Sequence, residues 1–234
     1  MCIVSVYELL VNNSQGGQAF WCWYTVCMLP EVPFSQIASV ILSLVVSLGF
    51  HEAMHAFVAH RLGDNTAAGE GRLTLNPLKH IDMVMTVILP LGMMLMGLPP
   101  ILIARPVPFD PNVVRYGEYG AAMVALAGPF TNLGLAVIGV LVVRIGLFAG
   151  PLFAELLGTF IVVNVSLFVF NMLPIPPLDG SRLLYAFAPE PLQRLMAQIE
   201  AMGFFALVVI LVVVLPVLGP VITTANEAVL LFLL

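Results

Sequence analysis

Three residues in the first quarter of the chain have types and a spacing suited to metal chemistry. His51, Glu52 and His55 form the pattern HExxH. Histidines four residues apart share one face of a helix, so both imidazoles can reach a single ion. Zn²⁺ suits imidazole nitrogens, and a catalytic zinc needs three protein ligands with the fourth position left to water. The pattern therefore requires a third ligand elsewhere, and it leaves Glu52 placed to accept a proton from the bound water.

The segment that carries HExxH is apolar except for a stripe of small polar residues. Ser39, Ser43 and Ser47 precede the two histidines at four-residue intervals. Such a face either lines a water path or substrate groove toward the metal, or lets a neighbouring helix approach closely, and the two roles are compatible. Histidines packed in a helix without an ion are the alternative to a metal site. Ionisable residues inside an apolar span are costly and usually functional, which favours the metal.

A candidate third ligand lies in the sequence NMLPIPPLDG at residues 171–180. Its prolines must end a preceding helix, because each lacks an N–H donor and clashes with the turn before it. Asp179 then lies on irregular backbone at the end of an apolar segment, which lipid tolerates only beside protein or a water-filled cavity. Its alternative role is a helix cap or a turn carboxylate. Asn171 can bind a substrate carbonyl or the developing oxyanion, or can satisfy freed backbone groups.

The composition places these residues in a membrane protein. Of 234 residues, 61% are hydrophobic and 9% are charged, and the mean hydropathy is +1.07. Soluble domains carry about 25% charged residues, so a soluble domain is excluded, and the same figures exclude a disordered chain. The chain has 8 Lys and Arg against 13 Asp and Glu, which leaves no basic stripe for nucleic acid. Its 3 cysteines have no CxxC spacing and indicate neither disulfides nor a thiolate metal site.

We predict an all-α polytopic membrane protein, a bundle of about five to six transmembrane helices. The apolar segments that we predict as spans are 34–62, 119–143, 156–173 and 204–218. The segment 1–33 is divided by polar residues into pieces too short to cross, and we expect a separate, membrane-associated N-terminal segment. The last apolar run, 228–234, is expected to form a partial further element with 221–225.

Residues 81–103 are apolar but interrupted by proline and glycine, so a continuous helix there would lose backbone hydrogen bonds in lipid. We predict a re-entrant hairpin instead. The hairpin puts every lysine and arginine except Arg144 on one side, whereas a crossing divides them equally. Lysine and arginine collect in cytoplasmic loops, so the re-entrant hairpin is favoured over a crossing. It brings the ends of 34–62 and 156–173, and with them Asp179 and the histidines, to the cytoplasmic face.

Three motifs together resemble the site-2 protease family of intramembrane zinc metalloproteases. They are HEAMH at 51–55, GPFTN at 128–132 and NMLPIPPLDG at 171–180. GRLTLNP at 71–77 and ARPVPF at 104–109 are similar to its short prokaryotic form, which lacks PDZ and CBS domains. The resemblance covers about residues 34–182.

The resemblance implies one Zn²⁺ bound by His51, His55 and Asp179, with Glu52 as the catalytic base. It implies a multi-pass protein of the cell membrane whose active site lies toward the cytoplasm. Its partners would be the lipid bilayer and membrane proteins, which it would cleave within or near their transmembrane segments. We therefore expect residues 34–234 to form one intramembrane metalloprotease domain. The sequence does not indicate an oligomeric state.

Two functions from other classes compete with proteolysis. A membrane metal-ion transporter would also place histidine and aspartate inside the bilayer, but it gives Glu52 no task. A helix-binding protein without proteolytic activity is the other alternative, and the intact Glu52 argues against it.

Smaller elements are expected around this site. Leu73–Leu75 and Val107–Phe109 flank the hairpin and should form a small β element near the cytoplasmic face. Its free edge can pair with an unwound substrate, or it is a self-contained two-stranded sheet. Asn132 follows Gly128 on a face suited to close helix packing, and we expect a structural role for it. Asn164 is placed to form a hydrogen bond across helices.

Overall fold

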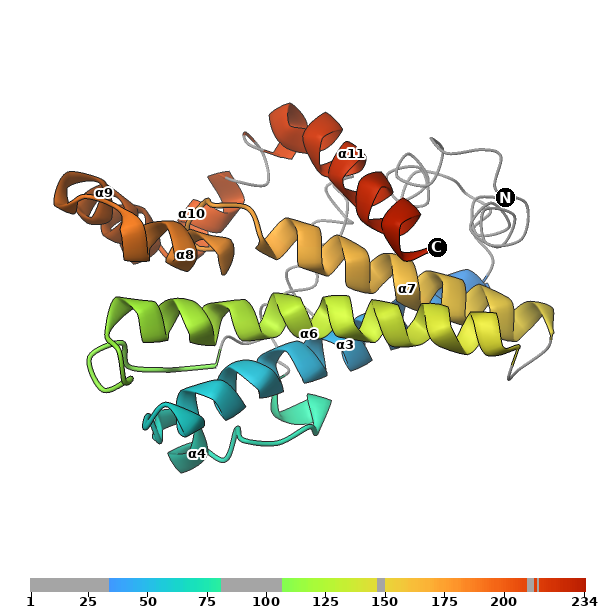
Figure 1. Cartoon of the computed structure of the whole chain (residues 1–234), viewed down its shortest axis with the longest axis horizontal. Helices are drawn as coiled ribbons and strands as arrows, with labels where there is room; N and C mark the ends of the chain where they lie inside the picture. The colour runs from blue at the N-terminus through green and yellow to red at the C-terminus, as the bar shows by residue number, and fades with distance from the viewer. Residues whose placement is uncertain (1–33, 81–106, 147–149, 210–212, 214) are drawn as a thin grey trace.

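Three long apolar helices form the centre of the protein. The computed structural model describes residues 34–80, 107–146, 150–209, 213 and 215–234. In these residues, α3 (Phe34–Arg61), α6 (Glu118–Ile145) and α7 (Pro151–Asn171) are long and apolar enough to cross a membrane. Each of the three packs against the other two (Figure 1). The predicted spans 34–62, 119–143 and 156–173 correspond to these helices.

The connection between α6 and α7 explains why these two helices are neighbours. α6 ends at Ile145 and is followed by the C-cap residue Gly146, whose φ of 64° is left-handed and favours glycine. α7 begins at Pro151, a position where the missing N–H of proline costs nothing. A short connection makes consecutive helices antiparallel and adjacent. The core between them and α11 (Leu215–Leu233) is aliphatic, and its buried residues are Ala136, Val140, Ile161, Val165, Val169, Ile222 and Leu230.

The predicted span 204–218 does not have the expected boundaries. The described chain contains a short helix, α10 (Phe204–Val209), and then α11 begins at Leu215 and continues to Leu233. α11 passes through the predicted end at 218 and through Gly219 without a break. Pro220 is accommodated inside the same helix. The runs 221–225 and 228–233 both lie in α11, so the further element expected from them is part of this helix. The described residues contain three candidate spans, so the larger predicted number is not confirmed.

The ends of the long helices that surround the site lie together. The Leu62 carbonyl, just after α3, accepts a hydrogen bond of 2.9 Å from the Arg115 N–H, just before α6. The chain thus leaves α3 and enters α6 at the same end of the bundle. This agrees with the reasoning behind the predicted hairpin, but residues 81–103 themselves lie outside the described residues, as do residues 1–33.

Short helices gather at this end. They are α4 (Thr66–Gly69), α8 (Gly180–Phe187) and α9 (Glu190–Ala201). The 3-10 turn η1 (Pro77–Lys79) lies nearer the middle of α3, where Pro77 is beside Gly49. α8 packs on α6, and the rings of Tyr119 and Phe187 meet edge to face at 5.5 Å. Figure 1 shows α8 and α9 beyond the end of α7. The contact of α8 with α6 holds the start of α8, and hence Asp179, near the middle of the bundle.

The predicted β element is not confirmed. Leu73–Leu75 and Val107–Phe109 are both described, and neither forms a strand; the described part of the chain is all-helical apart from its turns and loops. Leu73 and Leu75 are exposed, whereas Val107 is buried. Val107 lies against α3 through a contact with Glu52, which is described below.

Candidate metal centre

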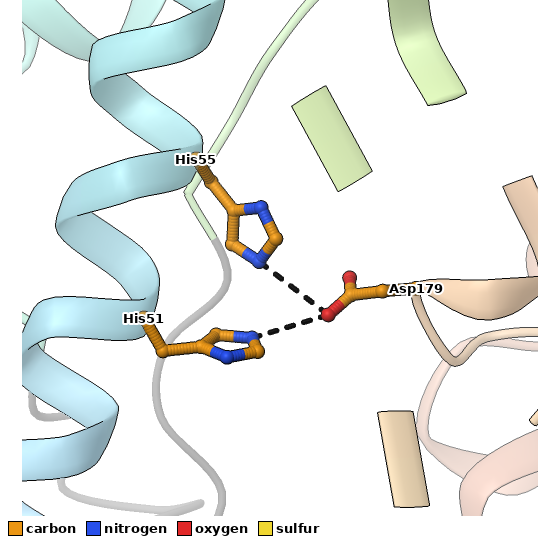
Figure 2. A group of neighbouring side chains, drawn as sticks. All are labelled: His51, His55 and Asp179. Carbon is orange, nitrogen blue, oxygen red and sulfur yellow. Dashed lines mark ion pairs between the residues drawn. The ribbon is translucent and has the colours of Figure 1, made fainter. Parts of the chain in front are cut away.

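The three predicted ligands lie together although they come from opposite halves of the sequence. His51 Nε2 lies 3.1 Å from Asp179 Oδ2, and His55 Nε2 lies 3.4 Å from the same oxygen (Figure 2). The three potential ligand atoms are all within 4.8 Å of one another. Both histidines are buried, and the side chain of Asp179 is 23% exposed. The group is therefore enclosed by the bundle and open on the side of the carboxylate.

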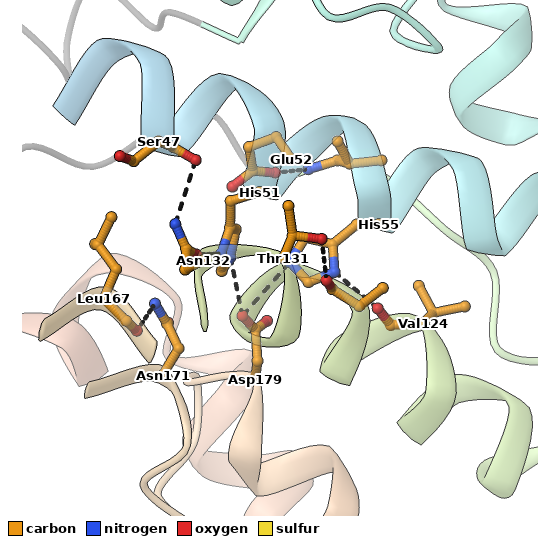
Figure 3. Close-up of polar contacts among 12 residues, drawn as sticks. Ser47, His51, Glu52, His55, Val124, Thr131, Asn132, Leu167, Asn171 and Asp179 are labelled. Carbon is orange, nitrogen blue, oxygen red and sulfur yellow. Dashed lines mark hydrogen bonds and ion pairs between the residues drawn. The ribbon is translucent and has the colours of Figure 1, made fainter. Parts of the chain in front are cut away.

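The two imidazoles are oriented by hydrogen bonds at their other nitrogens. His51 Nδ1 lies 2.5 Å from Asn132 Oδ1, and His55 Nδ1 lies 2.8 Å from the Val124 carbonyl oxygen (Figure 3). Oxygen acceptors require the proton on Nδ1, so Nε2 carries the lone pair in the neutral form of each imidazole. Histidines that bind metals in proteins have this arrangement, because the second hydrogen bond fixes the tautomer and the ring orientation.

Asp179 is at the N-cap position of α8 but does not act as a cap. Its side chain makes no capping hydrogen bond to the helix backbone, and its Oδ2 faces the two imidazoles. The following residue must be glycine, since a Cβ on Gly180 would lie 2.4 Å from the Met172 carbonyl oxygen at the end of α7. The close turn after α7 therefore directs the carboxylate into the bundle.

The distances and the donor types fit a zinc ion. Ligand atoms about 2.1 Å from a tetrahedral zinc lie about 3.4 Å from one another. The two nitrogen-to-oxygen distances, 3.1 and 3.4 Å, are close to that value. Two imidazoles with one carboxylate are the type of ligand set found in catalytic zinc sites that keep a position for water.

Gly128 of α6 borders the same space. A Cβ at this position would lie 2.4 Å from His55 Nε2 and 2.6 Å from His51 Nε2. The backbone of α6 thus passes directly over the two candidate nitrogen ligands, and only a residue without a side chain fits there. Gly128 is the first residue of GPFTN, one of the motifs identified in the sequence, and this contact explains why a glycine is needed there.

Glu52 is held from outside the group of ligands. Its Oε2 accepts a hydrogen bond of 3.0 Å from the Val107 N–H, and its side chain is buried (Figure 3). Glu52 is adjacent to His51 and is not one of the three clustered ligands. The backbone of Val107 therefore orients the carboxylate, which sequence reasoning did not predict. The similarity of ARPVPF to a family motif and the predicted β element at Val107–Phe109 pointed to this segment, but neither indicated a contact with Glu52.

Asp64 fixes the segment that follows Val107. Its Oδ1 accepts hydrogen bonds from the Thr66 N–H at 2.8 Å and the Thr66 hydroxyl at 2.5 Å, and its Oδ2 accepts one from the Asp110 N–H at 2.7 Å. Burial raises the pKa of the Asp64 carboxyl, but these hydrogen bonds lower it by more, so the pKa lies below its ordinary value. The ionised carboxylate thus joins the end of α3 to the segment that holds Glu52.

Asn171 is not brought into the group of ligands. Its Nδ2 donates a hydrogen bond of 3.0 Å to the Leu167 carbonyl oxygen of its own helix (Figure 3). This contact corresponds to the second of the two predicted roles, the satisfaction of backbone groups near the end of α7. Substrate binding by Asn171 stays a prediction.

Asn132 has a larger role than predicted. It is fully buried and bonds to His51, and its Nδ2 also donates to Asn164 Oδ1 at 2.9 Å. The hydrogen bond across helices that was expected for Asn164 is thus present. The four-residue spacing of Gly128 and Asn132 was the available signal, because it puts both on the face of α6 that meets the histidines.

Comparisons with known proteins agree with this chemistry. The model of peptidase family M50 matches residues 147–215, which include Asp179. The chain is 36% identical over 208 residues to a Bacillus subtilis protein named "Putative zinc metalloprotease YwhC", and the match covers 85% of this chain and 92% of that protein. No solved structure matches the chain.

Two mycobacterial proteins with the same description and the name Rip2 are also similar. The chain is 35% identical over 185 residues to Rip2 of Mycolicibacterium smegmatis, which covers 74% of this chain and 66% of that protein. It is 34% identical over 182 residues to Rip2 of Mycobacterium tuberculosis, which covers 75% of this chain and 66% of that protein. The chain therefore spans nearly all of the Bacillus relative and slightly less than two thirds of the Rip2 proteins.

Proposed function

The chain belongs to peptidase family M50 and is a zinc metalloprotease, and from that premise we propose that it cleaves other membrane proteins within or near their transmembrane segments. The observation that carries the proposal is the meeting of His51, His55 and Asp179 inside a bundle of apolar helices. A metal-ligand set between spans is accessible to a substrate that is itself in the bilayer.

Each residue of the site has a distinct task in this proposal. His51, His55 and Asp179 hold one Zn²⁺, which when bound polarises the scissile carbonyl and lowers the pKa of the attacking water. Glu52 accepts the proton of that water as the oxygen forms its bond to the carbonyl carbon. Glu52 then returns the proton to the amide nitrogen as the carbon–nitrogen bond breaks. The Val107 N–H supports this role because it holds the carboxylate beside His51.

We further propose a multi-pass protein of the cell membrane with the site toward the cytoplasm, and a single metalloprotease domain over residues 34–234. The distribution of positive charge supports this orientation. Arg61, Arg72 and Arg115 lie at the end of the bundle where α3 ends, and Arg144 lies in the last turn of α6, at the other end. Positive residues favour the cytoplasmic side of a membrane.

The proposal is tested with the purified protein in liposomes that contain a single-span model substrate. Glu52→Gln keeps an oxygen to accept the Val107 N–H but cannot take up a proton. We expect this variant to cleave about 10²- to 10⁴-fold more slowly than wild type while it binds zinc normally. Asp179→Ala should lose zinc and activity together. Measurements are cleavage by gel analysis and zinc content by atomic spectroscopy.

The same liposomes distinguish the protease from a transporter. A transporter would move zinc across the vesicle membrane and would not cleave the substrate. Glu52→Gln would then have no cleavage activity to lose while zinc binding is kept. Rapid cleavage by Glu52→Gln, or full zinc content in Asp179→Ala, would contradict the assigned roles.

A further inference from the structure

Two fully buried amides link α7 to the metal centre. Asn132 of α6 and Asn164 of α7 both have 0% exposure and lie within long apolar helices. Uncompensated amides in such surroundings are costly, so each donor and acceptor is expected to have a partner. Hydrogen bonds form a continuous series from the Phe160 carbonyl through Asn164 and Asn132 to His51.

The orientation of the Asn164 amide is fixed by a group that can only accept. Its Nδ2 lies 2.8 Å from the Phe160 carbonyl oxygen. A carbonyl cannot donate a hydrogen bond, so the nitrogen and not the oxygen of the amide must face it. Asn164 Oδ1 therefore faces Asn132, at 2.9 Å from its Nδ2.

The orientation of Asn132 follows from that of Asn164. Its Nδ2 faces Asn164 Oδ1 and also lies 3.4 Å from the Ser47 carbonyl oxygen of α3. Rotation of the amide by half a turn would put its oxygen against both acceptors. Asn132 Oδ1 is thus directed at His51 Nδ1, at 2.5 Å, and that nitrogen must carry the proton.

The two histidines differ in how their tautomers are fixed. His55 Nδ1 bonds to the main-chain carbonyl of Val124, which has no alternative orientation. His51 Nδ1 bonds to a side-chain amide, which would present an NH₂ donor if it were reversed. A reversed Asn132 would favour the proton on Nε2 of His51 and remove the lone pair that faces Asp179. The tautomer of His51, unlike that of His55, therefore depends on a second residue, Asn164, which orients the hydrogen-bond partner Asn132.

We propose that Asn164 is a positioning residue for the metal centre. It acts through Asn132, whose amide it holds so that His51 presents Nε2 as a metal ligand. The proposal rests on the ligand set assigned under the proposed function. It also means that α7, which leads into Asp179, supports the metal at a second point, through α6.

Zinc affinity of the full-length protein, measured by competition with a chelator, tests the proposal. Asn132→Leu is expected to bind zinc about 10- to 100-fold more weakly, as is usual when a partner of a ligating histidine is lost. Asn164→Leu should bind more weakly than wild type but less so than Asn132→Leu, since Ser47 still holds the Asn132 amide. The double variant should match Asn132→Leu alone, because in the described part of the chain the hydrogen bonds from Asn164 reach His51 through Asn132.

Thr131→Val is the matched control. The Thr131 hydroxyl bonds to the Ala127 carbonyl of its own helix, and it neighbours Asn132 in the sequence without joining the series. Its zinc affinity should equal that of wild type. Wild-type affinity in Asn164→Leu, or losses that add in the double variant, would overturn the proposal.

A measurement on wild type covers the case in which a leucine variant does not fold. Nitrogen-15 spectra of histidine-labelled protein should show the His51 proton on Nδ1 and an unprotonated Nε2, with His51→Gln used for assignment. A proton on Nε2 of His51 alone would contradict the inference. Asp179→Ala separates this proposal from the proposed function. If this variant binds zinc as wild type does, the ligand set is wrong. If it loses zinc, wild-type zinc affinity in Asn164→Leu rejects only the role of Asn164.

Discussion

Gly128 sets how closely α6 approaches the candidate ligands. An added methyl group would lie within 2.6 Å of both Nε2 atoms, far inside ordinary contact. The neighbouring backbone belongs to a long helix that also holds Val124 and Asn132, so it cannot move without disturbing both histidine hydrogen bonds. The residue is therefore part of the geometry of the site although it offers no ligand atom.

Gly128→Ala should weaken zinc binding strongly. Overpacking costs about 1–3 kcal/mol, which is roughly 5- to 150-fold in affinity if the strain falls on the metal-bound state. Gly134→Ala on the same helix is the control, because a Cβ at Gly134 would have no neighbouring atom within 4 Å. Zinc affinity by chelator competition checks both variants, and equal affinities would show that α6 can move away from the ligands.

At the scale of elements, the segment from Val107 to Arg115 connects the end of α3 to the proposed base. It is held by Glu52 at Val107, by Asp64 at Asp110 and by the Leu62 carbonyl at Arg115. The three contacts are spread along the C-terminal half of α3 and the turn that follows it. A non-helical segment is thereby given a defined position beside the site.

Val107→Pro should slow proteolysis without loss of zinc. Proline removes the N–H that orients Glu52, and a hydrogen bond to a charged group contributes about 1.5–3 kcal/mol, or roughly 10- to 150-fold in rate. Val107→Ala keeps the N–H and should retain most of the activity. Single-turnover cleavage and zinc content are the measurements. Equal rates for the proline and alanine variants would mean that this contact does not orient the base.

Asp64 should make stability depend on pH in a defined direction. Its folded pKa lies below the ordinary value of 3.8, so the unfolded chain binds the proton first as the pH falls. Its stabilisation is complete well above 3.8 and is lost as the pH falls through the folded pKa. Asp64→Asn turns an NH₂ toward one of the backbone donors, so at pH 7 it should lower the melting temperature.

The difference in melting temperature between wild type and Asp64→Asn should shrink below about pH 4, because the unfolded wild-type chain takes up a proton there before the folded protein does. Thermal unfolding in detergent at several pH values measures it. A difference that stays constant down to pH 3 would contradict the assigned state of Asp64.

At the scale of the whole molecule, both ends of the bundle carry exposed positions that can report its orientation. Leu152 is 67% exposed near the start of α7, and the Arg194 side chain is 75% exposed on α9, at the end where the site lies. With the natural cysteines replaced by serine, Leu152→Cys should react with an impermeant maleimide in intact cells. Arg194→Cys should react only after lysis. The reverse pattern would place the site on the outer side.

Features that depend on a local sequence pattern can be predicted from the sequence. Contacts that depend on which helices pack together cannot. HExxH needs only helical spacing, and Asp179 could be proposed because prolines must end the preceding helix. The contacts of Asn132 and Val107 depend on how α6 and the 107–115 segment pack against α3, and no local pattern reports this. The predicted span 204–218 was ended at proline and glycine, whereas α11 continues as a helix through Gly219 and Pro220 to Leu233.

The candidate ligands come from α3 and from the turn after α7, separated in the chain by more than half of its length. An ion shared between them would fasten these two distant parts of the protein as a cross-link does. Occupancy would then contribute to the free energy of folding, because the ion binds the folded form and leaves the unfolded chain. Chelation should accordingly lower the melting temperature of wild type and leave that of Asp179→Ala unchanged. The coordination bonds that prepare the metal for catalysis would then also set the thermal stability of the enzyme.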